Sequence, residues 1–303
     1  MSAAPAAPRF WRNLSFWGLL PAWAMMGVAL ILPIFIVAAV SVATRGAYGN
    51  FAWDLNFSAY RQILFAESWE GGLEFTWQYL VIIIRTLILA LVTTLLCLML
   101  ALPVAYQIAR QPATRKAALI YLVTLPFWVS MVLRIYAWMI ILGRDGPLAR
   151  FFGLFGAPAD LSFMYNDGAT LAAMVYTYMP LMVLPVFTSI EKLDGALIEA
   201  AHDLYGSRWT ALRRVILPLT APGIGAGAIL VFVPALGALV EPSLMGGGKQ
   251  MMMGSLIQLQ FGGGRNWPFG AAIAMTLLIF VMIVLIGMAQ RAAARSRAAE
   301  AAA

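Results

Sequence analysis

Long apolar stretches separated by short polar segments are the dominant pattern of this chain. Crossing a membrane core about 30 Å thick requires about 20 predominantly apolar residues in a helix. Six stretches meet this requirement, so we predict an all-α integral membrane protein with six transmembrane helices. They cover residues 17–44, 80–109, 117–142, 169–190, 215–240 and 270–290.

The first stretch is predicted to be a span rather than a cleaved export signal. It follows Arg9 and Arg12 and ends at Ser41-Val42-Ala43, which resembles a signal-peptidase site. Its apolar part is well beyond the roughly 7–15 residues of a signal peptide. We therefore expect it to remain uncleaved.

The overall composition excludes a soluble domain. Of the 303 residues, 62% are hydrophobic and only 11% are charged, which leaves too few polar residues to cover a water-exposed surface. The net charge of +7 does not indicate a nucleic-acid partner, because the basic residues lie in short clusters between apolar stretches. The single cysteine, Cys97, excludes a disulfide within the chain.

The distribution of basic residues predicts the orientation in the membrane. Twelve lysines and arginines lie in the two terminal segments and in the loops after the second and fourth stretches, against six in the other loops. Basic residues are enriched on the cytoplasmic side of membrane proteins. We therefore expect a transmembrane domain over residues 17–290, with cytoplasmic N- and C-termini in the tails 1–16 and 291–303.

Two segments on the opposite side are predicted to be structured. Residues 58–65 are expected to form a short amphipathic helix with Tyr60, Ile63 and Leu64 on one side. Residues 251–259 lie between two glycine-rich stretches and are long enough for a re-entrant element that is buried in the protein.

The segment 189–218 is the longest polar interruption on the predicted cytoplasmic side. Its first half places three leucines on one face of a helix. Gly206 then permits a left-handed turn, and Ser207 can cap a second helix that ends at Pro218. We predict a helical hairpin that lies on the membrane face. The three leucines are Leu193, Leu197 and Leu204.

The length of this hairpin indicates docking onto another protein, because a connection between two spans needs only a few residues. The chain carries no nucleotide-binding loop of its own. Gly248-Lys249 is followed by Gln250, Ser243 stands where a P-loop has its first glycine, and the stretch falls on the predicted outer side. We therefore expect a separate ATPase subunit as the partner.

The hairpin also resembles a known coupling element. Glu199-Ala200-Ala201, followed at the family's spacing by Val215-Ile216-Leu217-Pro218, is similar to the EAA loop of binding-protein-dependent ABC importers. One position departs from the family pattern, because the usual glycine is Tyr205 here and Gly206 follows one residue later. The resemblance implies the permease fold of type I ABC importers, with a short helix of this loop seated in a cleft of the ATPase. The residues that it assigns to the ATPase-coupling loop are Glu199, Ala200, Ala201, Asp203, Tyr205, Gly206 and Pro218.

Further motifs are similar to the polyamine (spermidine/putrescine) branch of this family, and the resemblance covers nearly the whole chain from Tyr60 onward. It implies a multi-pass permease of the bacterial inner (plasma) membrane that binds no cofactor itself. The implied partners are a second permease subunit, different by family analogy, two ATPase subunits that use ATP and Mg²⁺, and an extracytoplasmic solute-binding protein. The matching motifs begin at Arg85, Pro103, Leu125, Leu133, Tyr165 and Asn266.

Charged residues inside the spans are expected to face protein, water or headgroups, because each costs about 2.5–3.5 kcal/mol in lipid. Arg85 lies near the outer end of its span and is expected to snorkel. For Arg134 we favour a structural ion pair with Asp145 or Asp167 over contact with the solute.

A polycation also needs carboxylates and aromatic faces along its route. Glu241, where the fifth stretch meets the outer side, is expected to face this path, since it cannot face lipid cheaply. An arginine in the same channel would oppose a polyamine, so Arg134 is either paired or argues against this solute. The aromatic candidates are Tyr136, Trp138, Tyr176 and Tyr178, each of which also fits helix packing or an interfacial belt.

Other functions were weighed against this interpretation. The same machinery could import another amine, an opine or an amino-acid-like compound. An ATP-independent secondary transporter would be expected to have inverted repeats and carboxylates deep within a span, and no acidic residue lies there. An intramembrane enzyme needs a converging nucleophile and base or metal ligands, and the only histidine is His202. We therefore predict no catalytic residue and no metal site.

Overall fold

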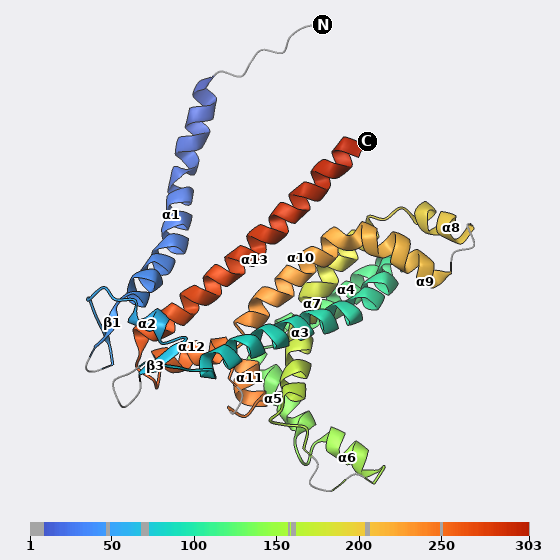
Figure 1. The fold of residues 1–303 in the computed structure, drawn as a ribbon. Coiled ribbons are helices and arrows are strands. Elements are labelled where there is room, and N and C mark those ends of the chain that lie inside the picture. Colours follow the sequence, from blue (N-terminus) through green and yellow to red (C-terminus); the bar gives the residue numbers. More distant parts are fainter. Residues whose placement is uncertain are drawn as a thin grey trace.

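The computed structural model describes residues 9–46, 49–67, 73–156, 158, 162–203, 207–248 and 251–302 (Figure 1). Helices dominate this part of the chain, as the apolar pattern predicts. Two small antiparallel sheets, which the sequence analysis did not predict, follow the first long helix. They pair β1 (Thr44–Arg45) with β2 (Phe51–Ala52), and β3 (Phe65–Glu67) with β4 (Leu73–Phe75).

The helices differ widely in length. The long ones are α1 (Arg9–Ser41), α3 (Gln78–Ala109), α7 (Asp167–Glu191), α10 (Leu217–Leu236) and α13 (Trp267–Ala302). The short ones are α2 (Ser58–Arg61), α4 (Ala113–Trp128), α5 (Met131–Leu142), α6 (Pro147–Gly153), α8 (Gly195–Asp203), α9 (Arg208–Ala211), α11 (Val240–Met245), α12 (Met253–Phe261) and the π-helix η1 (Leu212–Ile216). Five helices of the described chain are long and apolar enough to cross a membrane, and the bent pair α4–α5 makes six crossings if it counts as one span.

The third predicted span, 117–142, is not one straight helix. The helices on either side of Val129 and Ser130 are bent by 92°, because ψ is 136° and 134° at these two residues, far from helical values. Pro126 also removes one N–H group from the last turn of α4. The prediction of a continuous helix is therefore wrong, since an unbroken apolar run does not reveal such a break.

The core of the bundle is formed by α3, α7 and α10, which pack on one another through buried side chains. Two glycines of α10, spaced four residues apart, lie in close contact with α7. A Cβ atom on Gly223 would lie 2.5 Å from the carbonyl oxygen of Pro185, and one on Gly227 would lie 2.7 Å from Sδ of Met182. Small residues at this spacing allow close packing of membrane helices.

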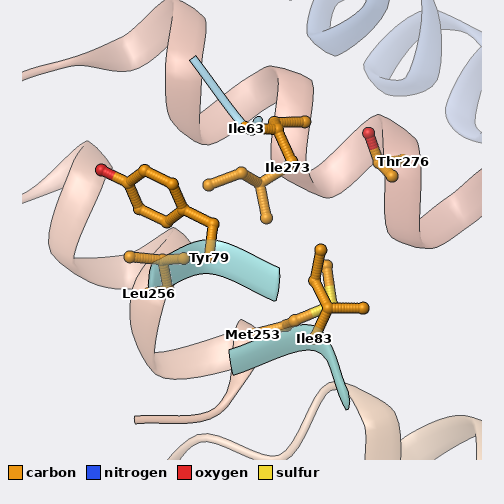
Figure 2. A pocket seen from close by; sticks show the side chains of 7 residues that line it. All are labelled: Ile63, Tyr79, Ile83, Met253, Leu256, Ile273 and Thr276. Atoms are coloured by element: carbon orange, nitrogen blue, oxygen red, sulfur yellow. The ribbon is translucent and has the colours of Figure 1, made fainter. Parts of the chain in front are cut away.

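Helices α1 and α13 pack against each other beside this core. A second apolar cluster, which surrounds the small pocket in Figure 2, joins α13 to α3 and α12. From Leu19 on, most large side chains of α1 remain exposed, so this part of the helix presents an apolar surface to lipid or to another protein. The residues around the pocket are Ile63, Tyr79, Ile83, Met253, Leu256, Ile273 and Thr276.

The two predicted outer segments have different outcomes. The amphipathic helix at 58–65 is found only over Ser58–Arg61, after which the chain turns into β3. Ile63 is buried whereas Leu64 is 39% exposed, so the predicted common face is wrong. The element at 251–259 corresponds to α12, whose start is fixed by a hydrogen bond of 3.0 Å from the Met253 N–H to Oγ1 of Thr86.

The bundle has two ends (Figure 1). What we call the hairpin end carries α8, α9, the start of α1 and the end of α13, and the sheet end carries the four strands, α6, α11 and α12. An ion pair between Arg85 and Asp167 joins α3 to α7 at the sheet end. Another, of 2.8 Å between Lys116 and Glu191, joins α4 to α7 at the hairpin end. The described segments that were predicted to be cytoplasmic therefore lie together at one end.

The described parts of the predicted tails 1–16 and 291–303 are helical, because α1 begins at Arg9 and α13 continues to Ala302.

Candidate coupling hairpin and solute path

Two capping residues define the arms of the predicted hairpin. Asp194 precedes α8, and its Oδ1 accepts a hydrogen bond of 3.0 Å from the N–H of Ala196. Ser207 precedes α9, and its Oγ accepts one of 3.2 Å from the N–H of Thr210, which confirms the predicted cap. The turn between the arms, with Tyr205 and Gly206, lies outside the described residues.

Much of the surface of this hairpin is exposed. Glu199, Ala200 and Asp203 are exposed on α8, whereas Ala201 is half-buried. Large apolar side chains are also uncovered, because Leu197 is 48% exposed and Trp209 is 67% exposed. These two side chains are the large apolar residues that the described part of the hairpin leaves available for a contact.

The second arm does not end at Pro218, contrary to the sequence prediction. Helix α9, the π-helix η1 and α10 follow one another without a break, and the N–H of Leu217 bonds to the carbonyl of Leu212, five residues earlier. Proline lacks an N–H group and its ring clashes with the carbonyl four residues earlier in an α-helix. The wider π-turn just before Pro218 accommodates this residue and lets the helix continue into the span.

The hairpin is firmly connected to the core. Its second arm continues into α10, which meets α7 at Gly223 and Gly227, and α7 leads into its first arm. The ion pair between Lys116 and Glu191 fixes the end of α7, from which the first arm continues, to α4. A displacement of the hairpin therefore reaches both core helices directly.

Two opposite charges are buried where α5, α7 and α11 meet. Glu241 on α11 is 0% exposed, and Arg134 on α5 is 9% exposed. Neither carboxylate oxygen of Glu241 forms a regular hydrogen bond with the described residues, although the hydroxyls of Thr177 and Tyr178 lie beside the carboxylate. Arg134 lies near enough to attract Glu241 electrostatically.

The partners predicted for Arg134 are wrong. Asp167 pairs with Arg85 instead, which also gives Arg85 a specific partner rather than a headgroup. Asp145 is exposed, and within the described residues no ion pair joins it to Arg134. The sequence could not show which acid lies near Arg134, because α5 turns by 92° from the direction of α4.

The aromatic path candidates fall into two places. Trp138 and Tyr176 meet edge to face, with ring centroids 5.8 Å apart, and Tyr178 is buried beside Glu241. Tyr136 is 52% exposed and lies two residues from Trp138, hence on the other side of α5. The structure thus places Tyr178 beside the buried carboxylate, and it brings Trp138 and Tyr176 into contact with each other.

Sequence analysis missed the glycine contact between α7 and α10. A signal was present, since Gly223 and Gly227 form the small-residue pattern that is typical of membrane helix packing. It also missed Thr86, whose hydroxyl accepts the Met253 N–H. No sequence pattern indicates this contact, because the two residues are 167 positions apart.

Known proteins share both the sequence pattern and the fold. Residues 98–298 match the family described as binding-protein-dependent transport system inner membrane component. The spermidine/putrescine transport system permease protein PotB of Escherichia coli (strain K12) is 40% identical over 209 residues, which cover 69% of this chain and 76% of PotB.

The similar solved structures are bacterial ABC transporters. A chain of the transporter involved in the import of the acidic polysaccharide alginate superposes with a TM-score of 0.69 at 16% identity, covering 94% of this chain and 98% of that chain. A chain of the alginate transporter in complex with an alginate pentasaccharide-bound periplasmic protein gives a TM-score of 0.69 at 17% identity, covering 93% and 96%. These likenesses confirm the predicted importer permease fold. The family match adds that this multi-pass chain belongs to the inner membrane components of binding-protein-dependent transport systems.

Proposed function

We propose that this chain is a permease subunit of an ABC importer for polyamines such as spermidine or putrescine. The observation that carries the substrate class is the 40% identity to the spermidine/putrescine permease over 209 residues. Another amine, an opine or an amino-acid-like compound is the alternative solute. In either case the chain forms the path through the membrane and performs no chemistry.

The hairpin is the proposed contact with the ATPase. Its exposed Leu197 and Trp209, together with the exposed Glu199, support a docking surface at the end that the basic residues assign to the cytoplasm. The coupling role of Ala200, Ala201, Asp203, Tyr205, Gly206 and Pro218 belongs to the same proposal. Two ATPase subunits bind ATP and Mg²⁺, and this chain itself binds no cofactor or metal.

A second permease subunit and an extracytoplasmic binding protein complete the proposed transporter. The solved alginate transporter in complex with a periplasmic protein supports the second of these partners. The binding protein delivers the solute at the sheet end, where the proposed path passes Trp138 and Tyr176. Tyr136 lies on the other side of α5. We propose that it lines the part of the path whose opposite wall is formed by the second permease subunit.

The docking proposal can be tested with Leu197→Ser. Burying a leucine side chain contributes about 1.5–3 kcal/mol, so the loss should weaken binding of the ATPase roughly tenfold or more. Co-purification of the ATPase and its hydrolysis rate should both fall while the permease still inserts. Leu154→Ser is the matched control, because Leu154 is 83% exposed next to α6 at the sheet end. Equal ATPase binding by the two variants would refute the docking surface.

The substrate class is tested by uptake. The assembled transporter with its binding protein, expressed in cells that lack other polyamine importers, should accumulate labelled spermidine or putrescine. If the transporter takes up neither amine in the presence of ATP, the polyamine assignment is refuted. The family membership would not be affected by this result.

A further inference from the structure

The buried charges of Arg134 and Glu241 need an explanation beyond packing. Neither Oε atom of Glu241, and neither Nε nor Nη1 of Arg134, forms a hydrogen bond with the described residues. An uncompensated charge in a protein interior is strongly destabilising. Arg134 and Glu241 attract each other without forming a direct ion pair, which is a weak arrangement for a purely structural pair.

The surroundings of Glu241 are suited to a cation. The hydroxyls of Thr177 and Tyr178 lie beside the carboxylate. One helical turn after Arg134, on the same face of α5, Trp138 meets the ring of Tyr176. Aromatic faces and hydroxyl oxygens both stabilise an ammonium group next to a carboxylate.

The position of Glu241 within the fold connects it to the hairpin. Glu241 lies in the first turn of α11, just after the end of α10 at Leu236. Helix α10 continues from the hairpin, and α7, which carries Thr177 and Tyr178, leads into the hairpin. A change at the hairpin end therefore acts on α7 directly and on α11 through α10.

We propose that Glu241 binds an ammonium group of the passing solute and that Arg134 is the counter-ion which this ammonium group replaces. The inference rests on the proposed function, and it names the chemistry that the site recognises. In the solute-free subunit the guanidinium compensates the buried carboxylate, so no bare charge is left behind after each transport cycle.

The exchange also explains how an arginine is compatible with a cationic solute. The ammonium group competes with the Arg134 guanidinium for the same carboxylate, so the solute binds weakly. Weak binding suits a path, because a solute must be able to leave each site as readily as it enters. Arg134 is thus a positioning and specificity-determining residue for amines.

The test uses the complete transporter in proteoliposomes with saturating, liganded binding protein. Uptake of labelled spermidine or putrescine and hydrolysis of ATP are measured in the same vesicles, and their ratio is compared between variants. Glu241→Gln should lower this ratio about tenfold, because one charge-assisted hydrogen bond to the amine is lost. Glu241→Asp should retain most of it. Asp145→Asn is the control, since Asp145 is an exposed carboxylate at the same end, and its ratio should not change.

Arg134→Met gives the complementary signature. Without the competing guanidinium the carboxylate should hold the amine longer. Labelled spermidine retained by the transporter trapped with ATP and vanadate should rise roughly tenfold while turnover falls. The double variant Arg134→Met/Glu241→Gln should lose this retention. If the Arg134→Met variant fails to assemble, Arg134→Lys is measured in its place. Its side chain is shorter, so it should compete less for the carboxylate, and retention of spermidine should rise here too.

Three results would overturn the inference. A purely structural role predicts that uptake and ATP hydrolysis fall together, in proportion to the amount of assembled transporter, with an unchanged ratio. Unchanged retention in an assembled Arg134 variant would refute the role of counter-ion. Absence of amine uptake by the unmodified transporter would remove both this inference and the polyamine assignment, whereas normal uptake with an unaffected Glu241→Gln variant would remove this inference alone.

Discussion

Gly223 is a point of close approach between α10 and α7, and it offers a quantitative test of how the hairpin is held to the core. A Cβ atom at this position would meet Oγ of Ser189 and would lie 2.5 Å from the carbonyl oxygen of Pro185 and 2.6 Å from Cβ of Ser189. The serine hydroxyl can rotate away, but the Pro185 carbonyl belongs to the backbone of α7. Gly223→Ala therefore requires the two helices to move apart.

The expected magnitude follows from two opposing terms. Overpacking of a close contact costs about 1–3 kcal/mol, and replacing glycine by alanine in a helix contributes about 1 kcal/mol in favour of the variant. Gly225 is the matched control on the same helix, since a Cβ atom there meets nothing within 4 Å. The helix term is common to both variants, so Gly223→Ala should be about 1–3 kcal/mol less stable than Gly225→Ala.

Thermal unfolding of the purified complex in detergent measures this difference. At about 2–4 °C for each kcal/mol, Gly223→Ala should melt about 2–12 °C below Gly225→Ala. Its uptake per ATP hydrolysed should also fall, because the spacing between α7 and α10 is altered. Equal melting temperatures, or a higher value for Gly223→Ala, would show that the two helices are not held at this distance.

Two other contacts give predictions of a similar kind. Thr86→Val should leave the buried N–H of Met253 without its acceptor and cost about 1–3 kcal/mol, measured by thermal unfolding. Thr94→Val is the control, because the Thr94 hydroxyl only donates to a carbonyl of its own helix, and a comparable loss there would contradict the assignment. The ion pair between Lys116 and Glu191 is partly exposed, so a double-mutant cycle with alanine should give a coupling of less than about 1 kcal/mol that decreases with added salt. A coupling of several kcal/mol would contradict that expectation.

The positions of the long helices could be predicted because a bilayer imposes a minimum length of apolar sequence. The same criterion could not reveal the bend at Val129 and Ser130, because the sequence on both sides of it is predominantly apolar. The helical arm after Ser207 could be predicted because capping is local in sequence, and the first arm could be predicted from the spacing of its leucines. Continuation through Pro218 could not, since proline usually ends a helix and the π-turn that accommodates it has no simple sequence signal.

Long-range contacts explain most of the remaining errors. Placing Glu241 among the path candidates needed only the cost of a carboxylate in lipid. The neighbour of Arg134 could not be identified in this way, because it depends on how α5 is oriented relative to α7 and α11. Asp167 was a reasonable candidate by charge, but it is positioned at the start of α7 next to Arg85.

The π-turn at Leu212–Ile216 has a consequence for the direction in which the hairpin faces. Such a turn takes up one residue more than an α-turn. The extra residue adds one position to the chain between α9 and α10, but it hardly changes the direction in which the α9 side chains point relative to those of α10. Deleting one residue of this turn would leave the direction of the Trp209 side chain relative to the core largely unchanged. Inserting or deleting a residue within α10 itself would rotate that direction about the helix axis by about 100°. The direction in which the hairpin faces a partner thus tolerates the loss of one residue in the π-turn, but it changes when α10 gains or loses a residue.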